Sequence, residues 1–304
     1  MPSRIRYARL ATERANPRSR ALDLLRPRQI AALMNREDRR AVVAVARARA
    51  DIATAVRMIV TALQRGGRLI FIGAGTSGRL GVIEAAECPP TFGTPPRLVQ
   101  AIMAGGRGAV FRSREGAEDD EIAARRAVRA RVRQGDVVVG ISASGVTPFV
   151  RAALRAARQG GARTVLITCN ATGLGTTFAN VRIVPATGPE VLAGSTRLKA
   201  GTATKLVLNT LTTAAMTGLG RVYGNRMVDL QPRSAKLRER ALRLIAEVAG
   251  VSRERALRAF VTSGGRVKVA IVIARNGWDA AEASRALRTA SGSLRVVLQK
   301  FRRK

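Results

Sequence analysis

Short apolar runs alternate with amphipathic stretches through the middle of the chain. Five runs are rich in Val, Ile and Leu, and several carry apolar side chains at consecutive positions: 68–72, 98–103, 136–142, 163–169 and 181–184. Consecutive apolar positions are typical of strands that are buried on both faces of a sheet. The pattern therefore predicts five strands, most of them parallel.

The stretches between these runs have the length and periodicity of helices. Residues 118–133 and 148–159 are amphipathic and long enough for the right-handed crossovers that join parallel strands. Upstream, residues 39–63 carry apolar side chains at helical spacing and end at Gly66-Gly67, which predicts a further helix packed on the sheet. The expected fold class is α/β, a three-layer αβα sandwich around a mostly parallel five-stranded sheet.

The last quarter of the chain lacks a convincing strand pattern. From residue 234 onward the sequence predicts three or four short helices, with Ser252 and Asp279 as N-caps, and a long helix over 200–220 leads into them. We expect an N-terminal arm (1–38), an α/β domain (39–232) and a small helical C-terminal module (233–304).

The composition restricts the chemistry that the chain can perform. Its 304 residues include no histidine, which excludes Ser-His-Asp or Cys-His nucleophile pairs and histidine-ligated zinc. Two cysteines, Cys88 and Cys169, lie far apart and form no metal-ligand spacing, as expected of a protein from the reducing cytoplasm. Carboxylates, lysines, hydroxyls and backbone groups remain.

The charge balance raises the question of a polyanionic partner. The chain has 54 basic and 20 acidic residues, a formal net charge of +34. The arginines are spread along the whole chain and aromatic residues are only 3%, so the stacking platforms of single-stranded nucleic-acid binders are nearly absent. Non-specific polyanion binding stays open. No signal peptide or membrane-spanning apolar segment is predicted.

Glycines and hydroxyl residues follow the first and third predicted strands. Parallel sheets bind ligands at the carboxyl ends of their strands, and helices begin directly after residues 73–79 and 142–147. Helix N-termini with nearby hydroxyls bind phosphate. The first loop reads G-x-G-x-x-G but lacks the acidic residue expected about 20 positions later in dinucleotide-binding proteins. Thr76 and Ser77 therefore favour a phosphate monoester.

Carboxylates and lysines are scarce enough to be informative. Glu84 and Glu87 are three positions apart on one predicted helix, and Glu87 lies near its C-terminal end, next to the predicted breaker Pro89-Pro90, where the helix dipole disfavours negative charge. The acidic residues over 115–121 match the first turn of a helix. Lys199 and Lys205 lie at the start of the long helix, where either a phosphate contact or ordinary capping accounts for them.

Several strings in the sequence closely resemble the N-acetylmuramic acid 6-phosphate etherase family. The similarity runs from about residue 12 to residue 298 and includes the specific string Glu-Cys-Pro-Pro-Thr. The matching strings are Thr12-Glu13 with Asn16-Pro17, 73–81, 86–93, 116–119, 188–191, 194–208, and 223–225 with 227–229. The resemblance implies the sugar isomerase (SIS) fold followed by a helical module.

The resemblance also implies a reaction and a pair of catalytic residues. Members of the family are lyases that convert N-acetylmuramic acid 6-phosphate to N-acetylglucosamine 6-phosphate and D-lactate without a metal or organic cofactor. The family's acid glutamate falls on Glu87, and its second catalytic glutamate falls on Glu118. In the ring-opened sugar the C1 aldehyde acidifies the C2 proton, so one carboxylate removes it while an acid protonates the departing lactyl oxygen. Water then adds to the unsaturated aldehyde.

The remaining site residues follow from the loops and from the family strings together. We expect the phosphate and sugar to be bound by Thr76, Ser77, Gly78, Ser142, Ser144, Thr147, Glu190, Ser195 and Lys199. The family also implies a homodimer. Two departures from its pattern are Val146, where arginine is common, and Arg226, where an apolar residue is usual.

Two other functions stay open at this stage. An SIS isomerase or a non-catalytic sugar-phosphate sensor would keep the phosphate loops but lose Glu87 or Glu118, and both are present. A polyanion-binding protein would bind DNA with an affinity that falls steeply with salt and ignores sugar phosphate.

Overall fold

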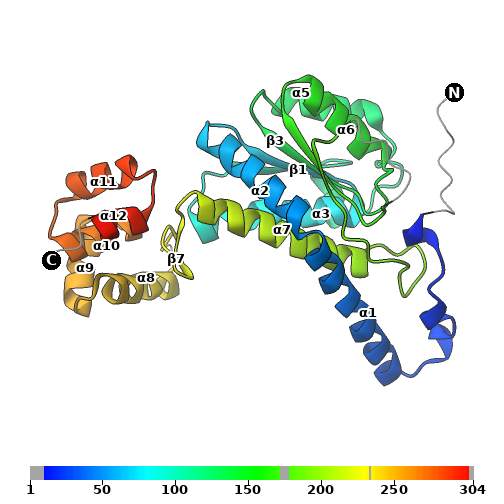
Figure 1. Cartoon of the computed structure of the whole chain (residues 1–304), viewed down its shortest axis with the longest axis horizontal. Coiled ribbons are helices and arrows are strands. Elements are labelled where there is room, and N and C mark those ends of the chain that lie inside the picture. The colour runs from blue at the N-terminus through cyan, green and yellow to red at the C-terminus, as the bar shows by residue number, and fades with distance from the viewer. Residues whose placement is uncertain (1–9, 172–177, 233, 301–304) are drawn as a thin grey trace. The chain divides into compact units, whose positions relative to one another are not determined.

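Five parallel strands form the sheet of the computed structural model, which describes residues 10–171, 178–232 and 234–300 (Figure 1). The strand order is β2-β1-β3-β4-β5, and every neighbouring pair is parallel. The strands are β1 (Leu69–Gly73), β2 (Val99–Met103), β3 (Val137–Ile141), β4 (Arg163–Ile167) and β5 (Val181–Ile183). The five predicted strands and the predicted fold class are confirmed.

Helices cover both faces of the sheet, as Figure 1 shows. On one face Ile70, Ile72 and Val138 pack with residues of α5 (Glu121–Arg131) and α6 (Pro148–Gln159). On the other face α2 (Arg49–Gln64) packs against β3 and β5, and α3 (Gly75–Phe92) approaches Phe71 and Ile141 through Gly81. The alternation of side chains along β1 thus supplies both cores.

The helix predicted over 39–63 is two helices in the structure. Helix α1 (Pro27–Arg47) begins well before residue 39, and Ala48 separates it from α2, which runs on from it in Figure 1. Pro27 occupies the first helical position, where its missing N–H costs nothing, and the side chain of Gln29 accepts a hydrogen bond from the Arg26 N–H at 2.8 Å. The polar run over 35–40 interrupts the apolar spacing between the start of α1 and residue 41.

Helix α3 continues through Pro89 and Pro90, so the predicted breaker lies inside the helix. Both prolines lie in the last turn, and the helix ends at Phe92, where the Gly93 N–H donates to the Pro89 carbonyl at 3.0 Å. Each proline lacks the N–H that would bond the carbonyl four residues earlier, and the helix ends two residues after Pro90. Helix α5 likewise starts at Glu121 and not at residue 118, because the Asp120 side chain accepts from the Ala123 N–H.

The chain divides into two compact units, 1–85 with 97–212 and 86–96 with 213–304. The ranges of these two units differ from the predicted arm, α/β domain and helical module (1–38, 39–232 and 233–304). That division into three parts remains a prediction. The second unit contains the two-stranded β6 (Val222–Tyr223) and β7 (Arg226–Met227), which the sequence did not predict. Five helices follow within its described residues: α8 (Ala235–Ala249), α9 (Arg253–Thr262), α10 (Val267–Asn276), α11 (Ala280–Thr289) and α12 (Leu294–Lys300).

Local signals set the helix ends of the second unit. Ser252 and Asp279 accept hydrogen bonds from the backbone of their first turns, as predicted for N-caps, and Gly250 and Gly277 end α8 and α10 in the left-handed conformation. The unit has its own core, in which Ile245 and Ile271 are fully buried. The expected helical module is therefore present, with one helix more than the upper number predicted.

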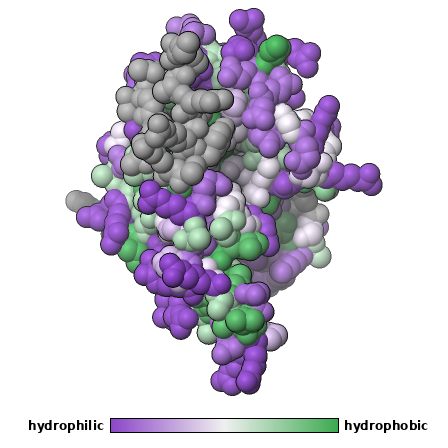
Figure 2. All heavy atoms as spheres, turned by 90° about the vertical axis from the view of Figure 1, so that its right-hand side faces the viewer, coloured by the Kyte–Doolittle hydropathy of each residue, from purple (hydrophilic) through white to green (hydrophobic). Residues whose placement is uncertain are grey.

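Among the residues that Figure 2 colours by hydropathy, hydrophilic ones predominate, with apolar residues between them in the lower half of the view. The arginines are spread along the sequence without one dense basic block, and the 54 basic and 20 acidic residues give a formal net charge of +34. Within the described residues, no helix is long and apolar enough to cross a membrane.

The close packing of α6 on β3 provides a stability test. A Cβ at Gly140 would lie 2.7 Å from Leu154 Cδ1 and 2.8 Å from Val150 Cγ1, so Gly140→Ala must displace two fully buried side chains of α6. We expect the free energy of unfolding in urea to fall by about 1–3 kcal/mol. Gly108→Ala, which meets no atom within 4 Å, is the matched control and should not lower it. Equal stability of the two variants would contradict this packing.

Candidate active site

A cavity of about 300 Å³ lies where β1 and β3 end side by side. The register pairs Gly73 with Ile141, so the loops that leave the two strands open at the same edge of the sheet. In the strand order 2-1-3-4-5 this pair is the switch point at which α/β proteins bind ligands. Both loops line the cavity, together with residues from 113–118, Glu13, Gly194 and Thr196.

Glycines allow α3 to begin directly against the end of β1. A Cβ at Gly73 would lie 2.6 Å from Gly78 N, and one at Gly78 would lie 2.6 Å from Gly73 O. Gly78 is buried and serves this approach; it does not line the cavity. Thr76 and Ser77 do line it, from the first turn of α3, where backbone N–H groups lack helical partners.

Ser142 is the centre of the second loop. Its hydroxyl lies 2.7 Å from Thr147 Oγ1 and 3.3 Å from Ser144 Oγ, and it accepts from the Gly145 N–H at 2.9 Å. Ser142 is 2% exposed, whereas Ser144 and Thr147 line the cavity. Ser142 therefore holds the two hydroxyls that a ligand would meet, at the start of α6.

Three carboxylates reach this cavity: Glu118, Glu115 and Glu13. The carbonyl of Glu118 accepts from the Phe149 N–H at 2.9 Å, so the first turn of α6 fixes the Glu118 backbone beside Thr147. The cavity thus combines hydroxyls, helix N-termini and carboxylates, which suits a polar ligand with a phosphate group. No group of three or more Cys, Asp or Glu side chains within the described residues could hold a metal ion.

Glu87 and Glu84 lie farther along α3 and do not line the cavity. Glu87 is exposed and follows Ser77 by ten residues (87 − 77), which is about 15 Å along a helix axis. Glu84 is buried, accepts from Lys205 Nζ at 2.6 Å and accepts from the Thr212 hydroxyl. These contacts engage both carboxylate oxygens of Glu84, so its carboxylate is part of the packing between α3 and α7 (Lys199–Gly218).

Lys199 and Glu190 belong to a buried charged cluster beside α7 (Lys199–Gly218). Lys199 Nζ donates to Glu37 Oε2 at 2.6 Å, and Asn16 Nδ2 donates to the same oxygen at 2.8 Å. The Glu190 carboxylate accepts from the N–H groups of Lys199 and Ala200 and caps α7. Neither residue lines the cavity, nor does Ser195, although its neighbours Gly194 and Thr196 do.

The pKa values of the two glutamates in this cluster shift in opposite directions. Burial opposes ionisation of Glu37, but hydrogen bonds from Lys199 and Asn16 and the charges of Lys199 and Arg40 outweigh it, so its pKa is lowered. Burial raises the pKa of Glu190 despite the backbone N–H donors. Burial also raises the pKa of the Cys169 thiol to about 12, which makes it unreactive.

Sequence reasoning missed the cavity role of Glu13 and the structural role of Arg79. Glu13 reaches the cavity from an N-terminal segment that the periodicity left unassigned, although the string Thr12-Glu13 contributed to the family resemblance. The guanidinium of Arg79 donates to the Ala109 and Val110 carbonyls, which ties α3 to α4 (Gly108–Phe111) at the cavity wall. Two residues depart from the family pattern: Val146 is buried, and Arg226 pairs with Glu247 at 3.1 Å.

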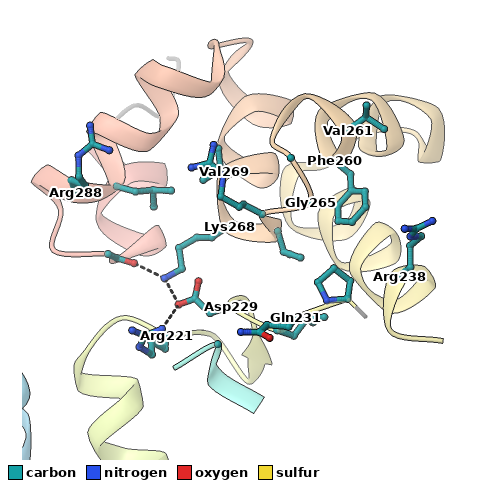
Figure 3. A pocket seen from close by; sticks show the side chains of 18 of the residues that line it. Arg221, Asp229, Gln231, Arg238, Phe260, Val261, Gly265, Lys268, Val269 and Arg288 are labelled. Atoms are coloured by element: carbon teal, nitrogen blue, oxygen red, sulfur yellow. Dashed lines mark hydrogen bonds and ion pairs between the residues drawn. The ribbon is translucent and has the colours of Figure 1, made fainter. Parts of the chain in front are cut away.

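The second unit has a larger cavity, of about 1090 Å³, shown in Figure 3. Its central cation is Lys268, whose Nζ donates to Asp229 at 2.7 Å and to the Gly220 and Gly292 carbonyls. All three Lys268 protons are thereby used, and Asp229 also pairs with Arg221 at 3.6 Å. These charged groups hold the unit together, so the smaller cavity is the better candidate for chemistry.

Residues 51–158 match the glucokinase regulatory protein N-terminal SIS domain, and residues 116–214 match the SIS domain. A phosphoheptose isomerase from Francisella tularensis has the same fold: it is 17% identical with a TM-score of 0.50, over 65% of this chain and 98% of that one. The fold and the cavity at its switch point define an SIS-domain protein.

Relatives extend this similarity over nearly the whole chain. N-acetylmuramic acid 6-phosphate etherase from Geobacillus thermodenitrificans is 51% identical over 95% of this chain and 99% of its own length. The etherase from Trichormus variabilis is 50% identical over 96% of both chains. The chain belongs to the N-acetylmuramic acid 6-phosphate etherase family.

The buried Lys199–Glu37 pair generates a stability prediction. Lys199→Met removes the only buried cation that pairs with Glu37 within the described residues and leaves its carboxylate with the half-exposed Arg18 and Arg40, at 3.8 and 3.4 Å. We expect the free energy of unfolding near neutral pH to fall by about 1.5–3 kcal/mol. The double variant Glu37→Leu with Lys199→Met leaves no unpaired charge and should lose less. Equal losses in the single and double variants, measured by urea denaturation, would contradict the pairing.

The same variants predict a pH dependence. Because the pKa of folded Glu37 lies below its usual 4.5, the stability from Glu37 is present above that value and is lost as pH falls through the folded pKa. We therefore expect wild-type stability to decline more steeply in acid than that of the double variant. The comparison uses urea denaturation at several pH values below 6.

Proposed function

We propose that the chain is a lyase that cleaves the D-lactyl ether of N-acetylmuramic acid 6-phosphate. The products are N-acetylglucosamine 6-phosphate and D-lactate, and the route is elimination followed by addition of water. Family membership and the cavity that brings Glu118 to two hydroxyl-bearing loops support this proposal. We further propose a cytoplasmic homodimer that acts in the recycling of cell-wall amino sugars.

The phosphate is bound where the two loops meet. Thr76 and Ser77 at the start of α3, with Ser144 and Thr147 before α6, offer hydroxyls and backbone N–H groups to its oxygens. The formal net charge of +34 also favours encounter with a dianionic substrate. Glu190 and Lys199 contribute indirectly, because their buried contacts fix the start of α7 near Gly194 and Thr196.

Glu118 faces the reacting carbons of the bound sugar. Its backbone is fixed one hydrogen bond from α6, while its side chain is exposed at the cavity. A carboxylate in this place can take the C2 proton of the ring-opened sugar, which the aldehyde acidifies. The electron pair left at C2 forms the C2–C3 double bond as the C3–O bond to the lactyl group breaks.

The departing lactyl oxygen requires a proton, and the family assigns this step to the residue at Glu87. In one chain Glu87 lies about 15 Å along α3 from Ser77, farther than the short chain of bonds that separates C3 from the phosphorus atom. We therefore propose that Glu87 of a second copy completes the site. The homodimer then becomes a requirement of the chemistry.

Replacement of Glu118 tests the proposed proton transfer. We expect Glu118→Gln to keep the folded structure and to lower the rate of D-lactate release by a factor of about 100 or more. Glu121→Gln removes a carboxylate from the first turn of α5, outside the cavity, and is the matched control. Near-normal turnover by Glu118→Gln in a coupled lactate assay would remove Glu118 from the mechanism.

Mixed dimers test the proposed sharing of the site. Glu87→Gln and Glu118→Gln chains are each expected to be inactive as pure dimers. Because the intact residues of the two chains meet in one of the two sites of a mixed dimer, random pairing should restore about a quarter of wild-type activity. Absence of restoration, with pairing verified by differently tagged chains, would show that each site uses one chain only.

A further inference from the structure

The cavity contains a carboxylate to which the two-glutamate scheme gives no role. Glu13 ends a short 3-10 helix (Ala11–Glu13) and lines the cavity together with Thr76, Ser144 and Glu118. Glu13 reaches the cavity from the N-terminal segment, which precedes every strand of the sheet in the sequence.

Asn170, just after β4, fixes the segment that carries Glu13. Its Oδ1 accepts from the Ala11 N–H at 2.9 Å, and its Nδ2 donates to Thr12 Oγ1 at 3.3 Å and to the Ser144 carbonyl at 3.1 Å. The Gly194 N–H donates to the Thr12 carbonyl at 3.2 Å. Thr12 is only 1% exposed, so the residue before Glu13 is locked between two cavity loops.

The Glu13 carboxylate is oriented and open to solvent. The Thr12 hydroxyl lies 3.4 Å from Glu13 Oε1, and Oε2 lies next to Gly194, where a Cβ would approach it to 3.4 Å. Glu13 itself is exposed at the cavity. The carboxylate therefore lies between the Thr12 hydroxyl and Gly194, which also lines the cavity.

The proposed elimination needs a proton transfer that precedes the step at C2. The substrate rests mainly as a closed ring, and only the open aldehyde acidifies the C2 proton. Opening the ring moves the O1 proton to O5 as the C1–O5 bond breaks. Glu118 and Glu87 are committed to C2 and to the lactyl oxygen, and the chain has no histidine that could serve instead.

We propose that Glu13 is a third catalytic carboxylate, which opens the sugar ring; this inference rests on the proposed function. The Glu13 carboxylate takes the proton from O1, the O1 electrons form the C1 carbonyl, and the C1–O5 electrons remain on O5. Glu13 then returns the proton to O5. The carboxylate is regenerated, and no other reactant is consumed.

Exchange between the anomers of N-acetylglucosamine 6-phosphate tests this role apart from lyase activity. This sugar opens and closes but has no lactyl group to lose, and proton NMR exchange spectroscopy follows its two anomeric signals. We expect the wild type to accelerate the exchange, and Glu13→Gln to lower the acceleration by about 100-fold or more. Glu115→Gln, another cavity carboxylate, is the matched control and should still accelerate it.

The binding of the same sugar separates catalysis from positioning. Glu13→Gln should bind N-acetylglucosamine 6-phosphate within about threefold of the wild type by calorimetry, and Glu13→Asp should recover part of the exchange. The proposal is overturned if the wild type does not accelerate exchange, if Glu13→Gln accelerates it normally, or if Glu13→Gln loses binding and exchange together. Failure of the lyase function alone, with Glu13-dependent exchange intact, would leave the ring-opening role standing.

Discussion

The parallel pairing of β1 with β3 is the constraint on which the site depends. Their register makes both strands end at one edge of the sheet, so the helices that follow, α3 and α6, present their N-termini to one cavity. Gly73 and Gly78 let the first turn of α3 lie against the strand end, where any side chain would collide with backbone. Ser142 then links the hydroxyls of the second loop.

Buried polar contacts attach the remaining segments to this frame. The Glu37–Lys199 pair and Asn16 join α1, the N-terminal segment and the start of α7, and Glu190 caps α7. Asn170 connects the N-terminal segment to the second hydroxyl loop. In a chain with 54 basic and 20 acidic residues, two acids, Glu37 and Glu190, make these buried contacts, and three more line the cavity.

The sheet could be predicted because its strands are apolar at consecutive positions, a pattern that only burial on both faces explains. The phosphate loops could be predicted because parallel topology places them at one edge. The start of α1 and the passage of α3 through Pro89-Pro90 could not, since both depend on end effects that periodicity does not record. Lys199 has a buried partner 162 positions away, and no local pattern encodes such a contact.

The central chemical claim is that the carboxylates of the cavity cleave the ether by elimination, after which water adds to the sugar. Oxygen tracing tests this claim most directly. The reaction of N-acetylmuramic acid 6-phosphate is run in ¹⁸O-water, and both products are examined by mass spectrometry. Elimination and hydration predict ¹⁸O at C3 of N-acetylglucosamine 6-phosphate and unlabelled D-lactate. Label in the lactate hydroxyl, with none in the sugar at C3, would mean cleavage on the lactyl side of the ether and would contradict the account.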